Sequence, residues 1–182
     1  MKKIKSKLQN LKNGKEILIR EAKEEDANEI LNYIETISRE SDFLTFGPGE
    51  FGISEIEEKE FLNNCAESEN LLYLVGVIND KIVSSLSFSA GSRPRIRHVG
   101  EFGVSVRKEY WNLGIGTLML DMLIDWIKAN QIINKINLSV RTDNNHAIAL
   151  YKNKGFIIEG TMSNDVFING TYFDNHCMGL TL

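Results

Sequence analysis

Two glycines that follow an apolar strand are the first residues whose type and spacing could do chemistry. Gly114 and Gly116 lie where the loop Lys108–Gly116 passes into a long apolar helix, about Ile115–Ala129. A helix start leaves backbone N–H groups unpaired, and the helix dipole adds partial positive charge there. Because glycine has no Cβ, a phosphate could approach this backbone closely. The pattern is typical of an anion site, although a glycine-shaped helix start without a ligand has the same sequence.

Two common phosphate-binding motifs are excluded. The chain contains no GxxxxGK[ST] segment, which excludes a P-loop nucleotide site. The dinucleotide fingerprint needs a third glycine at position 119, where Met119 stands, and an acid near the end of the next strand. That strand, Ile136–Val140, has no acidic residue. The expected phosphate loop is therefore of another kind.

Three separated segments together resemble the GNAT acetyltransferase superfamily. The strand and pyrophosphate loop of that family, [RQ]-x-x-G-x-[GA], are similar to Val104–Val106 followed by Trp111–Thr117. The family's N-x-x-A-I-x-L-Y-x-x-x-G-F segment resembles Asn144–Phe156 at every fixed position. The closing hairpin of many bacterial members is similar to Asn169–Asp174. The resemblance spans about residues 17–182, and three motifs in the right order make it specific.

The resemblance implies acetyl-CoA as co-substrate and no metal. Main-chain groups of the strand residues Val104, Ser105 and Val106 would pair with the pantetheine arm, and one N–H would polarise the thioester carbonyl. Asn144 would bond the same arm, cap the helix that follows it, or do both. The N–H groups that would hold the pyrophosphate belong to Asn112, Leu113, Gly114, Ile115, Gly116 and Thr117.

The loop departs from the family pattern at its first position. Trp111 stands where Arg or Gln is usual, and Asn112 stands where glycine is frequent. Because the family's Arg or Gln acts largely through the main-chain geometry of the loop, we expect cofactor binding to survive the change. The departure affects how closely the loop fits the phosphates.

Glu101 is the predicted general base. An alkylamine has a pKa near ~10.4 and attacks only when neutral, so a carboxylate beside it, or acting through water, must take its proton. Strand alternation places Glu101, Gly103 and Ser105 on one face, where Gly103 would leave space beside the carboxylate. The alternatives are a solvent-facing glutamate or an ion pair with Arg95 or Arg97.

Tyr151 is the predicted general acid. A neutral phenol with a pKa near ~10 can protonate the departing sulfur of coenzyme A. The residue lies in the second matched segment, on a helix over Asn144–Asn153 that begins just beyond the strand flanking the cofactor. The competing interpretation is a buried tyrosine that anchors this helix, since Ile148 and Phe156 nearby are core residues.

Alternating strands and helices must position these residues. The expected strands are Ile17–Arg20, Leu71–Ile78, Ile82–Ser89, His98–Val106, Ile136–Val140, Phe156–Met162 and about Tyr172–Leu180, with helices over about 24–38, 54–68, 115–129 and 144–153. This order indicates an α/β (α+β) fold with one mixed sheet covered by helices. The resemblance implies a GNAT-type sheet, mostly antiparallel, flanked by helices and splayed at the cofactor strands.

The net charge of −4 hides an asymmetry along the 182 residues. Six lysines and no acid lie in residues 1–15, whereas the rest of the chain has 15 basic and 25 acidic residues, a net charge of −10. We expect a solvated, lysine-rich extension over residues 1–16 and a single domain over residues 17–182. The acidic body argues against a nucleic-acid partner and suits a cationic substrate.

The composition, with 42% apolar residues, is that of a globular domain that needs no disulfide. Cys65 and Cys177 lie in no CxxC or Cys/His cluster, so no metal site is expected. No apolar run reaches the ~18 residues of a membrane span, and a secretory signal is absent, which predicts a cytoplasmic protein with no membrane partner. A homodimer is compatible with the sequence.

Two functions from different classes fit these observations. The first is an acetyl-CoA-dependent N-acetyltransferase, in which a primary amine of a small molecule or a protein attacks the thioester directly in a ternary complex. The second is a non-catalytic acyl-CoA-binding or sensor domain of the same fold. Tyr151 together with Glu101 favours the enzyme. The loop Phe43–Gly52 and the last hairpin are expected to shape the acceptor pocket, but the sequence does not identify the amine.

Overall fold

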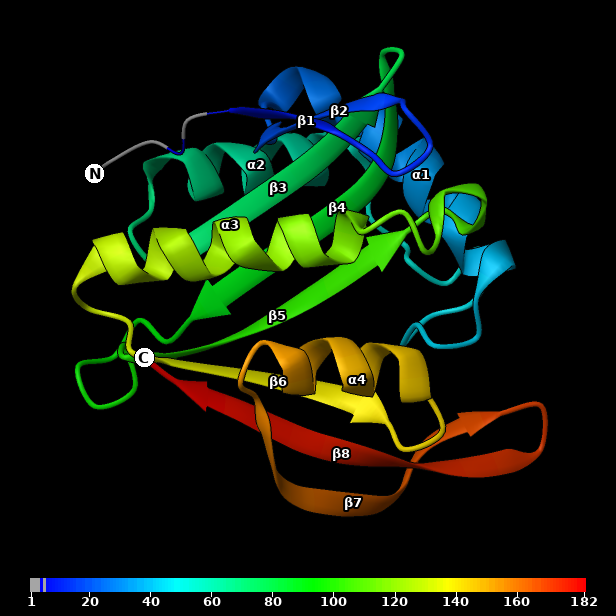
Figure 1. The fold of residues 1–182 in the computed structure, drawn as a ribbon, viewed down its shortest axis with the longest axis vertical. Coiled ribbons are helices and arrows are strands. Elements are labelled where there is room, and N and C mark those ends of the chain that lie inside the picture. Colours follow the sequence, from blue (N-terminus) through cyan, green and yellow to red (C-terminus); the bar gives the residue numbers. More distant parts are fainter. Residues whose placement is uncertain (1–3, 5) are drawn as a thin grey trace.

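The centre of the molecule is an eight-stranded sheet in the order β1-β2-β3-β4-β5-β6-β8-β7 (Figure 1). The computed structural model describes residue 4 and residues 6–182. Neighbouring strands are antiparallel except β5 and β6, which are parallel, so the predicted mixed and mostly antiparallel sheet is confirmed. The strands are β1 Lys7–Asn10, β2 Glu16–Glu21, β3 Leu71–Ile78, β4 Lys81–Ala90, β5 Val99–Val106, β6 Lys135–Arg141, β7 Ile157–Ile168 and β8 Thr171–Thr181.

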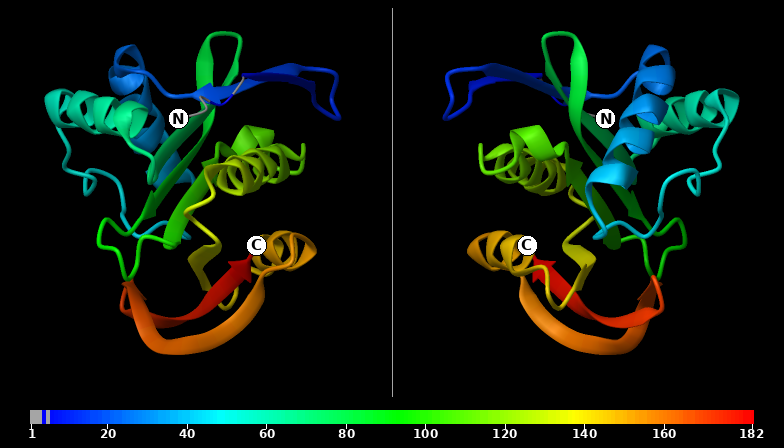
Figure 2. Two further views of the ribbon diagram at one scale, coloured as in Figure 1. Left: turned by 90° about the vertical axis from the view of Figure 1, so that its left-hand side faces the viewer. Right: turned by 90° about the vertical axis from the view of Figure 1, so that its right-hand side faces the viewer.

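Helices cover both faces of this sheet (Figure 2). α1 and α2 pack on one face, and α3 and α4 pack on the other. α3 is apolar around most of its circumference and is therefore buried along its length, with Asp125 and Lys128 left exposed. The described α-helices are α1 Ala27–Glu40, α2 Glu55–Glu67, α3 Ile115–Asn130 and α4 Asn145–Asn153, and short 3₁₀ turns occupy Glu24–Asp26 and Lys108–Tyr110.

Strand alternation divides the core into two clusters, one on each face of the sheet. On β3, Leu72 and Leu74 belong to the cluster under α3 and α4, whereas Tyr73 and Val75 belong to the cluster under α1 and α2. The same alternation applies along β5 and the part of β4 that pairs with it, residues 84–90, because this pairing has no bulge. A side chain on β5 therefore faces one helical layer or the other according to its position.

The parallel strands β5 and β6 pair over three rungs only, Val99–Lys135, Gly100–Ile136 and Glu101–Asn137. Beyond these rungs β5 stays paired with β4 and β6 stays paired with β8, so the two strands diverge (Figure 1). On the α4 side the rings of Phe102, Tyr151 and Phe156 pack together beside the divergence. The expected splay is confirmed, and it leaves one edge of β5 without a strand partner after Glu101.

The N-terminal segment differs from the expected solvated extension. Lys7–Asn10 forms strand β1 and pairs antiparallel with β2. Pairing satisfies the backbone groups at the edge of β2, and Leu11 is buried in the core. The lysine-rich composition of residues 1–15 does not indicate a strand. Lysine is nevertheless a usual residue on an edge strand, where it discourages further pairing. Three lysines of the predicted extension, Lys2, Lys3 and Lys5, lie outside the described residues.

Candidate functional site

The loop between β5 and α3 presents a run of free backbone donors. In the described part of the chain, none of the N–H groups of residues 112–117 donates to another protein atom. Asn112 (φ 63°) and Gly114 (φ 89°) have left-handed conformations, which form anion-binding concavities when they alternate with right-handed residues. No atom lies within 4 Å of where a Cβ of Gly114 would stand. With the positive end of the α3 dipole, this loop can hold a phosphate group.

Trp111 fixes this loop to the end of β5, a role that the sequence did not reveal. Its indole N–H donates a 2.6 Å hydrogen bond to the carbonyl of Val106. A second tie connects the loop to α1, since the backbone N–H of Lys108 donates to the Glu40 carboxylate at 2.7 Å. The tryptophan that replaces the usual Arg or Gln therefore anchors the loop through the main chain. The sequence signal that could have revealed this role is the presence of a tryptophan in a polar loop.

The free edge of β5 runs through Val104–Val106, with the alternate side chains turned to the two faces. The Ser105 hydroxyl lies 2.8 Å from the phenol oxygen of Tyr33 on α1 and 3.2 Å from the hydroxyl of Ser85 on β4. Burial raises the pKa of Tyr33, which keeps this phenol neutral. Tyr33 was also missed in the sequence, where it is a polar aromatic within the apolar stripe of its helix. The network uses side chains only, so on the side of the splay the main chain of Val104 stays free, while the Val106 carbonyl accepts from Trp111.

Glu101 lies at the last paired rung of the splay, with its side chain exposed on the face of α1 and α2. The regular pairing of β4 and β5 confirms the predicted alternation, so Gly103 and Ser105 share this face. A Cβ on Gly103 would meet only a serine hydroxyl at 3.9 Å, which confirms the space beside the carboxylate. Within the described residues Glu101 forms no salt bridge, and the alternative ion pair with Arg95 or Arg97 is absent.

Tyr151 lies on the opposite face, where α4 packs against the sheet. Its ring meets Phe102 edge-on at a centroid distance of 5.7 Å and contacts Phe156 at 5.9 Å. Burial raises the pKa of the phenol to about 12, so the group is neutral at pH 7. The fold thus brings Tyr151 to the splay but not to the face of Glu101, and β5 itself separates the two side chains.

Asn144 stands at the start of α4 as a helix cap. Its side-chain oxygen accepts a 3.2 Å hydrogen bond from the backbone N–H of Ala147. The predicted capping is therefore confirmed. The expected contact with a pantetheine arm stays a prediction, and the amide nitrogen is the part of the side chain left to make it.

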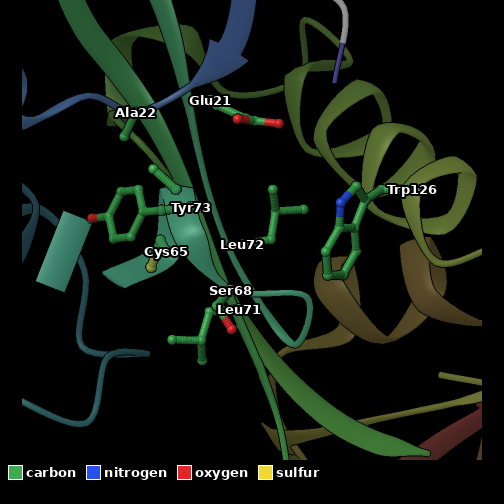
Figure 3. A pocket seen from close by; sticks show the side chains of 9 residues that line it. Glu21, Ala22, Cys65, Ser68, Leu71, Leu72, Tyr73 and Trp126 are labelled. Carbon is green, nitrogen blue, oxygen red and sulfur yellow. The ribbon is translucent and has the colours of Figure 1, made fainter. Parts of the chain in front are cut away.

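A metal site and an enclosed ligand cavity are the two other kinds of site considered in the described residues. No group of three or more His, Cys, Asp or Glu side chains there could hold a metal ion. A small cavity of about 10 Å³, the size of one water, lies at the start of β3 between Cys65, Tyr73 and Trp126, away from the splay (Figure 3). Both cysteines are free, and burial raises the pKa of Cys65 to about 12. No helix in the described chain is long and apolar enough to cross a membrane.

The chain matches proteins of known class over most of its length. The model of the acetyltransferase (GNAT) family matches residues 31–156. L-amino acid N-acetyltransferase AaaT of Escherichia coli (strain K12) is 33% identical over 117 residues, which are 62% of this chain and 70% of that protein. Spermidine N(1)-acetyltransferase of Vibrio cholerae is 30% identical over 79 residues, or 43% of this chain and 46% of that enzyme.

A solved structure agrees with the fold over most of the chain. The crystal structure of an acetyltransferase of the GNAT family from Streptococcus pneumoniae superposes with a TM-score of 0.89 at 35% sequence identity. The match covers 91% of this chain and 99% of that one.

Proposed function

Because the chain belongs to the acetyltransferase (GNAT) family, we propose that it transfers the acetyl group of acetyl-CoA to a primary amine of a small molecule or a protein, in a ternary complex. It is an N-acetyltransferase, as its relatives are. A non-catalytic acyl-CoA-binding domain is not favoured, since the matched relatives are named as enzymes. The donor, the acceptor and the residue roles that follow are part of the proposal.

The observation that carries the proposal is the loop of residues 112–117. Free N–H groups at a helix start, with open space over Gly114, suit the pyrophosphate of coenzyme A. The strand that feeds this loop has an unpaired edge at Val104–Val106, where an extended pantetheine arm finds main-chain partners. Asn144, at the start of α4, is the proposed side-chain partner of the same arm. These groups together would place a thioester at the splay.

We assign the two proton transfers to Glu101 and Tyr151. The acceptor enters as an ammonium and gives a proton to the Glu101 carboxylate, after which its nitrogen attacks the thioester carbonyl carbon. An N–H at the free edge of β5 would stabilise the negative oxygen that develops. When the carbon–sulfur bond breaks, the Tyr151 phenol gives its proton to the sulfur, the nitrogen loses its second proton to water, and water reprotonates the tyrosinate. The location of the two groups on opposite faces of β5 supports this division, because amine and thiol would approach from different sides.

The relatives guide the choice of acceptor. One is named for L-amino acids and another for spermidine, so small amines of both kinds are the first acceptors to test. A cytoplasmic location is proposed with them, because both thiols are free. The homodimer, and a function without nucleic acid or membrane partners, stay predictions from the sequence.

Release of free thiol from acetyl-CoA tests the proposal directly. The full chain is incubated with acetyl-CoA and a panel of spermidine and individual L-amino acids, and the thiol is followed with a colorimetric reagent. We expect turnover with at least one amine, and calorimetric binding of acetyl-CoA in its absence. Tight binding without turnover on any amine, including protein N-termini, would support the sensor domain instead.

A further inference from the structure

Asn137 stands beside Glu101 at the point where β5 and β6 separate. The two residues form the last rung of the parallel pair. Because partners in register in a sheet point to the same face, both side chains lie on the face of α1 and α2, on strands roughly 4.8 Å apart. Asn137 is one of the alternating polar residues of β6 and lies between the buried Ile136 and Leu138.

The Asn137 side chain has no partner in the described protein. Its Oδ1 atom is enclosed and accepts no hydrogen bond. The nearest cation on its strand, Lys135, is engaged by the Glu159 carboxylate at 2.8 and 2.9 Å. The register partner on β8 is Gly179, and the group that lies over it is the Glu159 carboxylate, which has no hydrogen to donate to Oδ1 when ionised. A buried carbonyl without a donor costs stability, and such a group in a native protein calls for a partner such as a water, an ion or a ligand.

We propose that Asn137 binds and orients the nitrogen of the acceptor amine, a proposal that rests on the proposed function. An ammonium has N–H donors for two neighbouring acceptors, and Glu101 with Asn137 supplies two. Because only the oxygen end of the amide is enclosed, a half-turn of the amide brings Oδ1 to the open side. After Glu101 takes one proton, the hydrogen bond to Asn137 holds the neutral nitrogen with its lone pair directed along the splay.

Two variants of Asn137 distinguish the effect of its acceptor oxygen on the amine KM from the effect of its packing. Asn137→Leu keeps the volume and removes both polar atoms, and it should raise the KM for the amine about 10- to 100-fold. The KM for acetyl-CoA should stay unchanged, and the melting temperature should stay equal or rise, because an unpaired buried carbonyl is removed. Asn137→Asp keeps an oxygen acceptor at the same place and should hold the amine KM within a few-fold of wild type.

Glu58 provides the control. Its Oε1 is likewise enclosed and without a partner in the described residues, but it lies on α2, which packs over β3. Glu58→Leu removes an enclosed, unpaired oxygen away from the rung of Glu101 and Asn137, and the amine KM should remain within about twofold of wild type.

The outcomes separate this proposal from the function on which it rests. If spermidine or an L-amino acid is acetylated and Asn137→Leu leaves its KM unchanged, the role of Asn137 is overturned and the enzyme stands. An equal rise of KM in Asn137→Leu and Glu58→Leu also overturns it, since the effect would then follow from the loss of any buried polar group and not from the position of Asn137. A wild-type chain that acetylates no amine overturns both together.

Discussion

Glu101 and Tyr151 are separated by a strand, and this separation decides what each can do. Glu101 is exposed beside the open space at Gly103, where a cationic amine loses little hydration on approach. Tyr151 is enclosed by aromatic rings, and burial raises its pKa to about 12. It therefore stays protonated until the departing sulfur accepts the proton. Opposite environments thus suit an acceptor and a donor of protons.

Replacing Glu101 by glutamine tests the base. Glu101→Gln keeps the shape but cannot accept a proton, so turnover should fall roughly 10²–10⁴-fold at neutral pH. The loss should shrink at high pH, where the amine is already neutral. Steady-state rates across pH check this, with Glu16→Gln as a control on an exposed strand position remote from the splay. A wild-type rate at neutral pH would assign the proton to a water held by backbone carbonyls.

Tyr151→Phe tests the acid, because it removes the proton and keeps the ring. We expect nearly normal acetyl-CoA binding by calorimetry, melting within a few degrees of wild type, and loss of most turnover. Tyr73→Phe removes another buried phenol, which lies on the opposite face of the sheet and two strands away from β5, and should retain turnover. Normal turnover in Tyr151→Phe, or a loss that only follows its stability, makes the tyrosine an anchor of α4.

Glu58 is a buried carboxyl that the proposed reaction does not use. It is 2% exposed, its Oε1 has no partner in the described residues, and burial raises its pKa. The folded state therefore binds more protons than the unfolded chain once the pH exceeds the ordinary value of about 4.3, and stability falls as the pH rises through the raised pKa.

Glu58→Gln removes this titration while keeping the shape. The variant should match wild type near about pH 4 and be more stable by on the order of 1 kcal/mol at neutral pH. Urea unfolding at several pH values measures the difference. A gain that is the same at every pH would mean that Glu58 is charged or neutral equally in both states.

At the scale of elements, the start of α3 depends on its neighbours as much as on its own residues. The Trp111 indole holds the loop to β5, and the Lys108 backbone holds it to α1. Gly114 takes the left-handed conformation that ends the loop and opens the helix. The free N–H groups are thus presented by a strand, a turn and a helix acting together.

Gly114→Glu should abolish acetyl-CoA binding by bulk and like charge. The fold should survive, since no atom lies near the new Cβ. Gly14→Glu is the matched control, because Gly14 also has a positive φ (80°) and open surroundings, but lies in the turn before β2. Both variants carry similar backbone strain, and calorimetry should show loss of binding only at Gly114. Unchanged affinity in folded Gly114→Glu rejects the phosphate loop.

At the scale of the whole molecule, Arg141 ties the two halves of the splayed sheet. From the end of β6 its guanidinium binds both carboxylate oxygens of Asp143 at 3.0 and 2.6 Å and donates to the carbonyl of Asp42 at 2.9 Å. It also stacks on Phe43, at 4.8 Å, and on Phe173, at 3.7 Å. One side chain on β6 thus connects the loop after α1 with β8 of the last hairpin, the two segments expected to shape the acceptor pocket.

Arg141→Leu should release the loop after α1. We expect a loss of about 1–3 kcal/mol and faster amide hydrogen exchange over residues 42–52, because a hydrogen bond and two ring contacts are removed. Lys59→Leu, which breaks an exposed ion pair on α2, should cost about 0–1 kcal/mol and leave the loop unchanged. Equal exchange in both variants would show that the loop is held by its own packing.

Much of this protein follows from local sequence. Hydrophobic periodicity and the capping box at Ser54 located the helices and all strands except β1, because those signals act within a few residues. The motif at Gly114 and the alternation around Glu101 were equally local. The polar register between Glu101 and Asn137, by contrast, joins residues on strands separated by a helix.

The tertiary structure alone decided which residues far apart in the sequence come into contact. It made a strand of Lys7–Asn10, because the edge of β2 offered partners that no local pattern discloses. It brought Tyr33 to Ser105, 72 residues away, and Arg141 to the loop at Asp42. Such contacts depend on how sheets twist and diverge, and the free energy that selects them comes from burial shared by the whole core rather than from the residues of one segment.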